Sequence, residues 1–151
     1  MAVVRGKLEF QNVVIMHTKS KYGDWQDQAQ QFRAFLVKND IFITGPVIVQ
    51  WELQEDESKE ADLTIYLPTY QKLQIEENDT FSYQERLLIE DGLKIRHADM
   101  ENDITATEAL LEIMAEKAEL KLQKPYYYIY LPVFQEYIVD IYAAIEEGEQ
   151  P

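Results

Sequence analysis

Two helical patterns in this chain end alike, one in Ile41-Phe42-Ile43-Thr44-Gly45-Pro46 and the other in Leu120-Lys121-Leu122-Gln123-Lys124-Pro125. The first pattern opens at Asp24 and the second at Asp103, so both ends lie 79 positions apart (103 − 24 and 125 − 46). Between those ends the register aligns Phe32 with Leu111 without a gap. Self-similarity at a fixed offset is typical of a repeated structural unit. The sequence therefore predicts two copies of one unit.

Each copy has one strand-like run before its helix and two such runs after it. The strands are expected at residues 8–18, 47–53, 62–67, 81–97, 125–131 and 137–145. We therefore expect an α+β fold with a duplicated strand–helix–strand–strand unit, as a single domain over residues 1–151. Repeat 1 covers about 8–68 and repeat 2 about 81–145. A pseudo-twofold should relate the copies within a mostly antiparallel sheet, with both helices on one face and a groove on the other.

Sequence signals at the helix ends support this reading. Asp24 is expected to cap the first helix, and Asp103 or Thr105 the second, where Thr105 and Glu108 form a capping-box pair. The first helix should end near Asn39. The expected apolar faces are Trp25, Ala29, Phe32, Phe35 and Leu36, and Leu110, Leu111, Met114, Ala115 and Ala118. Phe32 and Leu111 should occupy equivalent buried positions, and residues 54–60 are expected to form a charged hairpin loop.

The chain is strongly acidic, with a formal net charge of −14 from 28 acidic and 14 basic residues. Such a surface repels phosphate, so nucleic acid and membrane are not expected partners. It favours cationic ligands or basic protein surfaces. The alternative is that the charge only keeps the protein soluble. The absence of cysteine excludes disulfides and thiolate chemistry. No apolar run is long enough to span a bilayer and no secretory segment is recognisable, so we expect a cytoplasmic protein.

Known cofactor, metal and nucleophile motifs are missing from the sequence. The five glycines are scattered, so no phosphate loop is predicted. The run from Asp99 to Asp103 starts like a calcium loop, but Ile104 stands where glycine is needed and Leu110 where a bidentate glutamate is needed. His17 and His97 alone make a poor metal site. We therefore expect no cofactor and no metal, and name no catalytic residue.

Aromatic residues on the strands carry the candidate site. An acidic side chain among aromatic rings can hold a cation by its charge and by the ring quadrupoles. The expected ligand-binding residues are Trp51, Tyr66, Tyr128, Tyr130, Asp140 and Tyr142. Tyrosine is also common on half-buried strands without any ligand, so a purely structural role stays open.

Strand alternation predicts which way these side chains point, since residues two apart share a face. Ile129 and Leu131 should face the helices, and Tyr128 and Tyr130 should face the groove. On the last strand Val139 and Ile141 should face the helices, with Asp140 and Tyr142 facing the groove. The 79-residue register aligns Trp51 with Tyr130 and so places Trp51 in the groove as well.

The pattern resembles the GyrI-like, or bacterial effector-binding, family. The resemblance covers nearly the whole chain as architecture and lies in two loose motifs, Pro125-Tyr126-Tyr127-Tyr128-Ile129-Tyr130-Leu131 and Val139-Asp140-Ile141-Tyr142-Ala143-Ala144-Ile145. It implies the ligand-binding fold of multidrug-sensing regulators, and for some members hydrolase activity. Tyr128 stands where that family often has a ligand-contacting glutamate, and Ala144 replaces its closing proline.

These observations favour a module that binds a small aromatic or cationic molecule. No helix-turn-helix motif or basic patch accompanies it, so it is not expected to bind DNA. The alternative is an interaction or accessory protein whose acidic surface meets a basic partner, possibly in a secreted-toxin system. A hydrolase of small strained or activated substrates is the third hypothesis, so enzyme activity stays uncertain.

Overall fold

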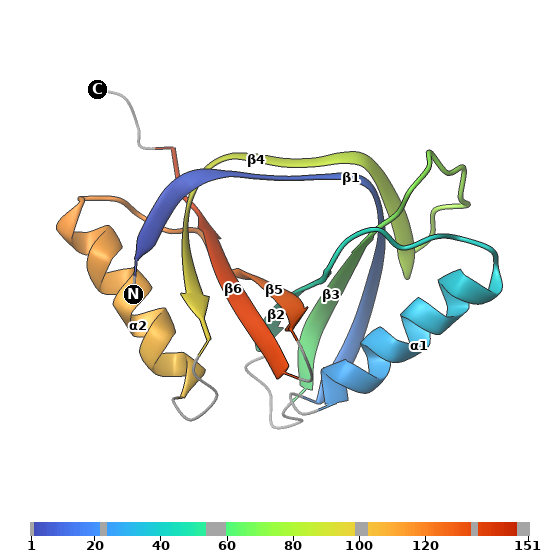
Figure 1. Cartoon of the computed structure of the whole chain (residues 1–151), viewed down its shortest axis with the longest axis horizontal. Helices are drawn as coiled ribbons and strands as arrows, with labels where there is room; N and C mark the ends of the chain where they lie inside the picture. Colours follow the sequence, from blue (N-terminus) through green and yellow to red (C-terminus); the bar gives the residue numbers. More distant parts are fainter. Residues whose placement is uncertain (1, 22–23, 54–59, 99–102, 134–135, 148–151) are drawn as a thin grey trace. The chain divides into compact units, whose positions relative to one another are not determined.

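The computed structural model describes residues 2–21, 24–53, 60–98, 103–133 and 136–147. Within these ranges the elements follow in the order β1 (Val3–Lys21), α1 (Trp25–Lys38), β2 (Val47–Leu53), β3 (Glu60–Pro68), β4 (Phe81–His97), α2 (Ile104–Lys117), β5 (Tyr127–Val133) and β6 (Glu136–Ala144) (Figure 1). The expected loop at 54–60 and the calcium-like run from Asp99 lie mostly outside the described residues. Neither described helix has the length and apolar composition that crossing a membrane requires.

The chain divides into two compact units. The first unit is Glu9–Leu87, and the second unit is Met1–Leu8 with Leu88–Pro151. Each unit has a central strand that pairs antiparallel on both sides: β3 between β1 and β2 in the first unit, and β6 between β4 and β5 in the second. Both units therefore contain the same strand–helix–strand–strand order with the same pairing. The predicted α+β fold with a duplicated, antiparallel unit is confirmed.

The two helices end in the same way, 79 residues apart. Asp40 and Glu119, just past the helices, have φ values of 60° and 58°, in the left-handed region. The next amide in each copy reaches back into the helix, from Ile41 to the Leu36 carbonyl at 3.0 Å and from Leu120 to the Ala115 carbonyl at 2.9 Å. The duplication thus extends to individual backbone hydrogen bonds.

The helix starts lie where the sequence predicted them, but the predicted capping box is not formed. Asp103 caps α2, because its carboxylate accepts the Thr105 amide at 3.0 Å. The predicted capping box is wrong, since Glu108 accepts the hydroxyl of Tyr128 instead. Asp24 holds the N-cap position of α1 but makes no side-chain cap bond.

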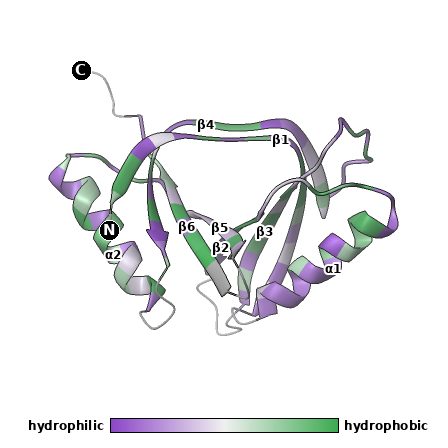
Figure 2. Cartoon of the chain, viewed as in Figure 1, coloured by the Kyte–Doolittle hydropathy of each residue, from purple (hydrophilic) through white to green (hydrophobic). Residues whose placement is uncertain are grey.

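The helices bury the residues that the register pairs. Phe32 and Leu111 are both buried, as predicted, and so are Leu36 and its register partner Ala115. The predicted faces are too wide, because Phe35 and Met114 are exposed. Figure 2 shows that α1 turns from hydrophilic near its start to hydrophobic near its end.

Candidate functional site

Tyr126, directly before β5, and Tyr128, within β5, point toward α2. The Tyr126 hydroxyl donates to Glu112 Oε1 at 2.8 Å, and the Tyr128 hydroxyl donates to Glu108 Oε1 at 3.0 Å. The prediction that Tyr128 faces away from the helix is therefore wrong, and Tyr130 shares its face by alternation. The reason is that a tyrosine can bury its ring in a helix interface while its hydroxyl bonds to a carboxylate on the helix.

These contacts shift two ionisation equilibria. Burial raises the pKa of the Glu108 carboxyl, and the neighbouring Glu112 carboxylate raises it further, whereas the Tyr128 hydroxyl acts in the opposite direction. Burial also raises the pKa of the Tyr126 phenol, as does its bond to Glu112. Tyr126 therefore stays a protonated hydrogen-bond donor at neutral pH.

Trp51 also points toward a helix. Its ring lies 6.4 Å from the Trp25 ring at the start of α1, with 37° between the ring planes. The prediction that Trp51 faces away from α1 is wrong, although the register that aligned Trp51 with Tyr130 holds, since both lie on helix-facing sides. Gln50, on the opposite face, accepts the hydroxyl of Tyr66. Polar residues next to Trp51 in the sequence thus occupy the face without the helix.

A small pocket lies beside the two indoles. It is a shallow depression with a cavity volume of only about 10 Å³, it opens to solvent, and it is lined by Ser20, Lys21, Trp25, Trp51, Ala61 and Leu63. The register explains the space, because Ser20 pairs with Ala61 where two small side chains meet. We call this the tryptophan pocket. Sequence reasoning found only Trp51 of this set; Trp25 was assigned to the helix core, and no local signal marked the small residues.

Tyr66 lies on the helix-free face of the first unit. Its neighbours there include His17 and Thr64, which pair across β1 and β3 and whose Nδ1 and Oγ1 atoms lie 3.3 Å apart. The Tyr66 side chain is buried. Tyr66 and Trp51 therefore lie on opposite faces of one strand pair.

Asp140 and Tyr142 lie on the helix-free face of the second unit, as alternation predicted. Asp140 is only 4% exposed and accepts from Arg96, from Nε at 2.8 Å and from Nη2 at 3.1 Å. Sequence reasoning missed Arg96, whose position directly opposite Asp140 follows only from the β4–β6 register. Because the carboxylate is already paired, it is a poor site for a ligand cation.

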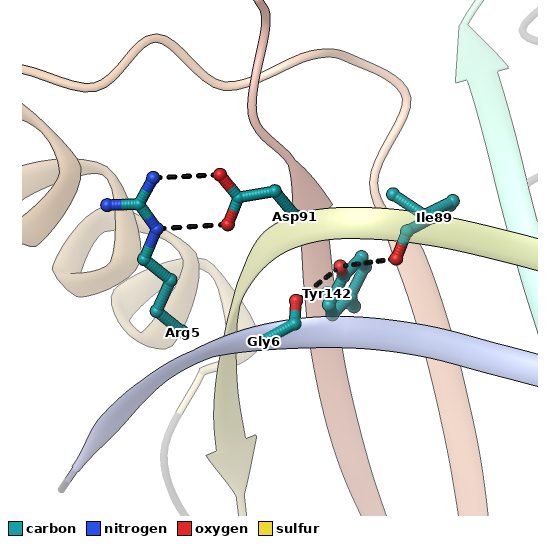
Figure 3. Close-up of polar contacts among 5 residues, drawn as sticks. All are labelled: Arg5, Gly6, Ile89, Asp91 and Tyr142. Atoms are coloured by element: carbon teal, nitrogen blue, oxygen red, sulfur yellow. Dashed lines mark hydrogen bonds and ion pairs between the residues drawn. The ribbon is translucent and has the colours of Figure 1, made fainter.

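Tyr142 has a structural environment. Its ring is buried, and its hydroxyl donates to the Gly6 carbonyl at 2.7 Å, with the Ile89 carbonyl at 3.4 Å (Figure 3). Burial raises the pKa of Tyr142 to about 12. A bidentate pair between Arg5 and Asp91 lies nearby in the same unit (Figure 3). Tyr142 ties β6 to the start of β1 and offers no open stacking surface.

Comparison with known proteins gives a family and a shared fold. Residues 9–148 match the model of a family described as "Domain of unknown function (DUF5085)". Comparison with curated proteins finds no significant match.

Several solved structures share the fold at low sequence identity. An uncharacterised conserved protein from Listeria innocua has a TM-score of 0.69 at 11% identity, over 95% of this chain and 92% of that one. The C-terminal domain of EcmrR has a TM-score of 0.70 at 10% identity, over 98% and 100%. A hydrolase from Listeria innocua has a TM-score of 0.64 at 12% identity, over 95% and 91%. At these identities the likeness concerns the fold alone.

Proposed function

We propose that this chain, which belongs to the DUF5085 family, is a binding module for a small aromatic or cationic molecule. The observation that carries the proposal is the tryptophan pocket, where two indole rings with centroids 6.4 Å apart border a depression that opens to solvent. Trp51 is retained from the residues expected from the sequence, and Trp25 joins it. Four of the other expected residues have structural partners within their own units, namely Tyr66, Tyr128, Asp140 and Tyr142.

The pocket determines the class of ligand. An indole face can stack on an aromatic ring and is also the best aromatic partner for an organic cation. Drug-sized ligands occupy pockets of about 300–1,000 Å³, whereas this depression encloses only about 10 Å³, so a single ring or a small cationic head group would lie against the indoles at the surface and would not be enclosed. The Lys21 side chain lines the pocket, and its positive charge favours neutral aromatic ligands over cations.

The fold is compatible with this function. The sequence resembles the GyrI-like ligand-binding family, and the C-terminal domain of EcmrR, a protein also solved in a complex with DNA, has a similar fold. Fold alone does not assign function, so the proposal depends on the pocket.

Intrinsic fluorescence provides the test, because the chain has two tryptophans and both line the pocket. The panel contains indole, phenol and benzyltrimethylammonium. We expect a saturable change with at least one of them in the wild type, and its loss in Ala61→Val, which fills the pocket without removing a tryptophan. Ala109→Val, at an exposed position on α2, is the matched control and should bind normally. A saturable response that survives in a folded Ala61→Val variant, or no response to the panel, would reject the proposal.

An interaction protein is a second candidate, supported by exposed aromatic side chains. Phe42 and Tyr70 are 70% and 73% exposed, and the Tyr70 amide donates to the Phe42 carbonyl at 2.9 Å, so they lie on neighbouring backbone segments. Exposed apolar groups of this kind on an acidic chain suit a partner that is both apolar and basic. A labelled amphipathic Leu/Lys peptide should then bind the wild type and lose affinity for Phe42→Ser. Ile113→Ser, at an exposed position on α2, is the control.

The hydrolase hypothesis gains no support from the pocket. None of its six lining residues is a histidine, an aspartate or a glutamate, the side chains that most often act as general acid or base. Glu108, whose pKa is raised, is bonded to Tyr128 instead.

A further inference from the structure

Arg96 is held in one orientation by a buried carboxylate. Asp140 is almost fully buried, while the Arg96 side chain is 56% exposed. The two Arg96 bonds to Asp140 use Nε and Nη2, which is the side edge of the guanidinium. A bidentate pair with a buried partner fixes the guanidinium plane. Arg96 is thus a positioned cation with an open outer part.

This pairing leaves the end edge of the guanidinium unused. The group has five N–H donors in a planar fork, and Asp140 takes two of them. Nη1 and the second hydrogen of Nη2 have no partner among the residues that the structure describes. These donors point in parallel along the end edge, in the geometry that a carboxylate or phosphate accepts.

A second cation lies on the same face. Lys94 precedes Arg96 by two residues in β4 and pairs with Tyr142, as Arg96 pairs with Asp140. Residues two apart in a strand share a face and lie about 7 Å apart. One small molecule that carries an oxyanion can therefore contact both cations. Lys94 makes no ion pair with any described residue. Tyr127 shares this face, with its ring 6.3 Å from the Tyr142 ring.

The charge on this face is unusual for the chain. Across residues 92–97, 127–132 and 138–144, the helix-free side carries two cations and one acid, Asp140. A structural ion pair alone would explain Arg96, because a buried carboxylate needs a partner. It would not explain an unpaired Lys94 beside Arg96 in a chain of net charge −14.

We propose that Arg96 and Lys94 form a binding site for the carboxylate or phosphate group of a small molecule. Asp140 is the positioning residue that orients Arg96, and Tyr127 offers a half-buried ring beside the bound group. The site lies within the second unit and does not depend on the tryptophan pocket.

Side-chain NMR of the arginine Nε–Hε groups tests the site in the intact chain, which has four arginines. The probes are sodium benzoate, phenyl phosphate and, as the opposite charge, benzyltrimethylammonium. We expect one or both oxyanions to shift the Arg96 signal saturably, and the tighter of them identifies carboxylate or phosphate as the preferred group. Arg5 is the internal control, because it has the same bidentate geometry with an exposed partner, Asp91.

Lys94→Gln is the decisive variant, because it leaves the Arg96–Asp140 pair and therefore the fold intact. It should weaken the oxyanion affinity about tenfold, the scale of one charge-assisted hydrogen bond. Lys121→Gln, an exposed lysine in the same unit, should leave the affinity unchanged. The proposal is overturned if neither oxyanion shifts Arg96 more than Arg5, if the two lysine variants weaken binding equally, or if only the cation binds.

Discussion

The ring of Tyr142 occupies the space where a side chain on Gly92 would lie. A Cβ atom on Gly92 would approach the Tyr142 Cζ and Oη atoms to 2.4 Å and the Ala143 carbonyl oxygen to 2.6 Å. The ring cannot move away freely, because its hydroxyl is bonded to the Gly6 carbonyl. The large Tyr142 side chain of β6 can therefore pack here only because position 92 of β4 is a glycine.

Gly92→Ala should destabilise the protein by about 1–3 kcal/mol, the usual cost of overpacking a close-packed site. Urea denaturation followed by circular dichroism measures this loss. Gly6→Ala is the matched control, since a Cβ at Gly6 meets no atom within 4 Å. Equal stabilities for the two variants would contradict the close fit of Gly92 and Tyr142.

The repeat could be predicted from the sequence because it depends on spacing alone. The 79-residue register correctly aligned Phe32 with Leu111 and the two helix ends. Which face of the sheet carries the tyrosines could not be predicted in this way, because it depends on the helix that packs against the strand. Strand alternation separates Tyr128 from Ile129 but does not say which of them faces α2. The sequence did contain one indication: Glu108 and Glu112 lie one helical turn apart on α2 and can accept hydrogen bonds from tyrosine hydroxyls.

The site was less predictable than the fold for a related reason. Arg96 and Asp140 lie 44 positions apart and meet only through the β4–β6 register, which single strands do not reveal. The space beside Trp51 comes from the pairing of Ser20 with Ala61, two residues without any chemical mark. A pocket made by small side chains cannot be recognised until the strand register is known.

Tyr128→Phe should lower the free energy of unfolding by about 1 kcal/mol, because it removes one partly buried hydrogen bond and keeps the ring packing. It should also raise the pKa of Glu108 further, since the Tyr128 hydroxyl stabilises the ionised carboxylate. Carbon-detected NMR of the Glu108 carboxyl measures this pKa. Tyr70→Phe, at an exposed position, should change neither quantity, and an unchanged Glu108 pKa in Tyr128→Phe would rule out the bond.

Glu108 should make stability fall as pH rises. Its pKa is raised in the folded protein, mainly by burial, so the folded state binds this proton more tightly than the unfolded chain. The stabilising contribution is present below the unfolded pKa of about 4.3 and is lost as pH rises through the higher folded value. Glu108→Gln should remove this slope, whereas Glu116→Gln on an exposed part of α2 should keep it. Parallel stability–pH curves for the wild type and Glu108→Gln would be the contrary result.

The paired core positions should contribute similarly to stability. Phe32→Ala and Leu111→Ala should each cost about 2–5 kcal/mol, because each leaves a cavity beneath a helix. Ile113→Ala, at an exposed position on α2, should cost far less. A loss below about 1 kcal/mol at either core position, measured in denaturant melts, would contradict the assigned helix faces.

The chain should not bind nucleic acid at physiological salt. The net charge of −14 opposes a phosphate backbone at long range. The two cations of the proposed oxyanion site do not reverse this, since non-specific affinity comes from the counterions that phosphate contacts release, and two cations release few of them. Fluorescence anisotropy with labelled duplex DNA at several salt concentrations checks the expectation, with phenyl phosphate as competitor to separate one phosphate group from a backbone. Micromolar binding that weakens steeply with salt would show that local charge outweighs the overall field of the chain.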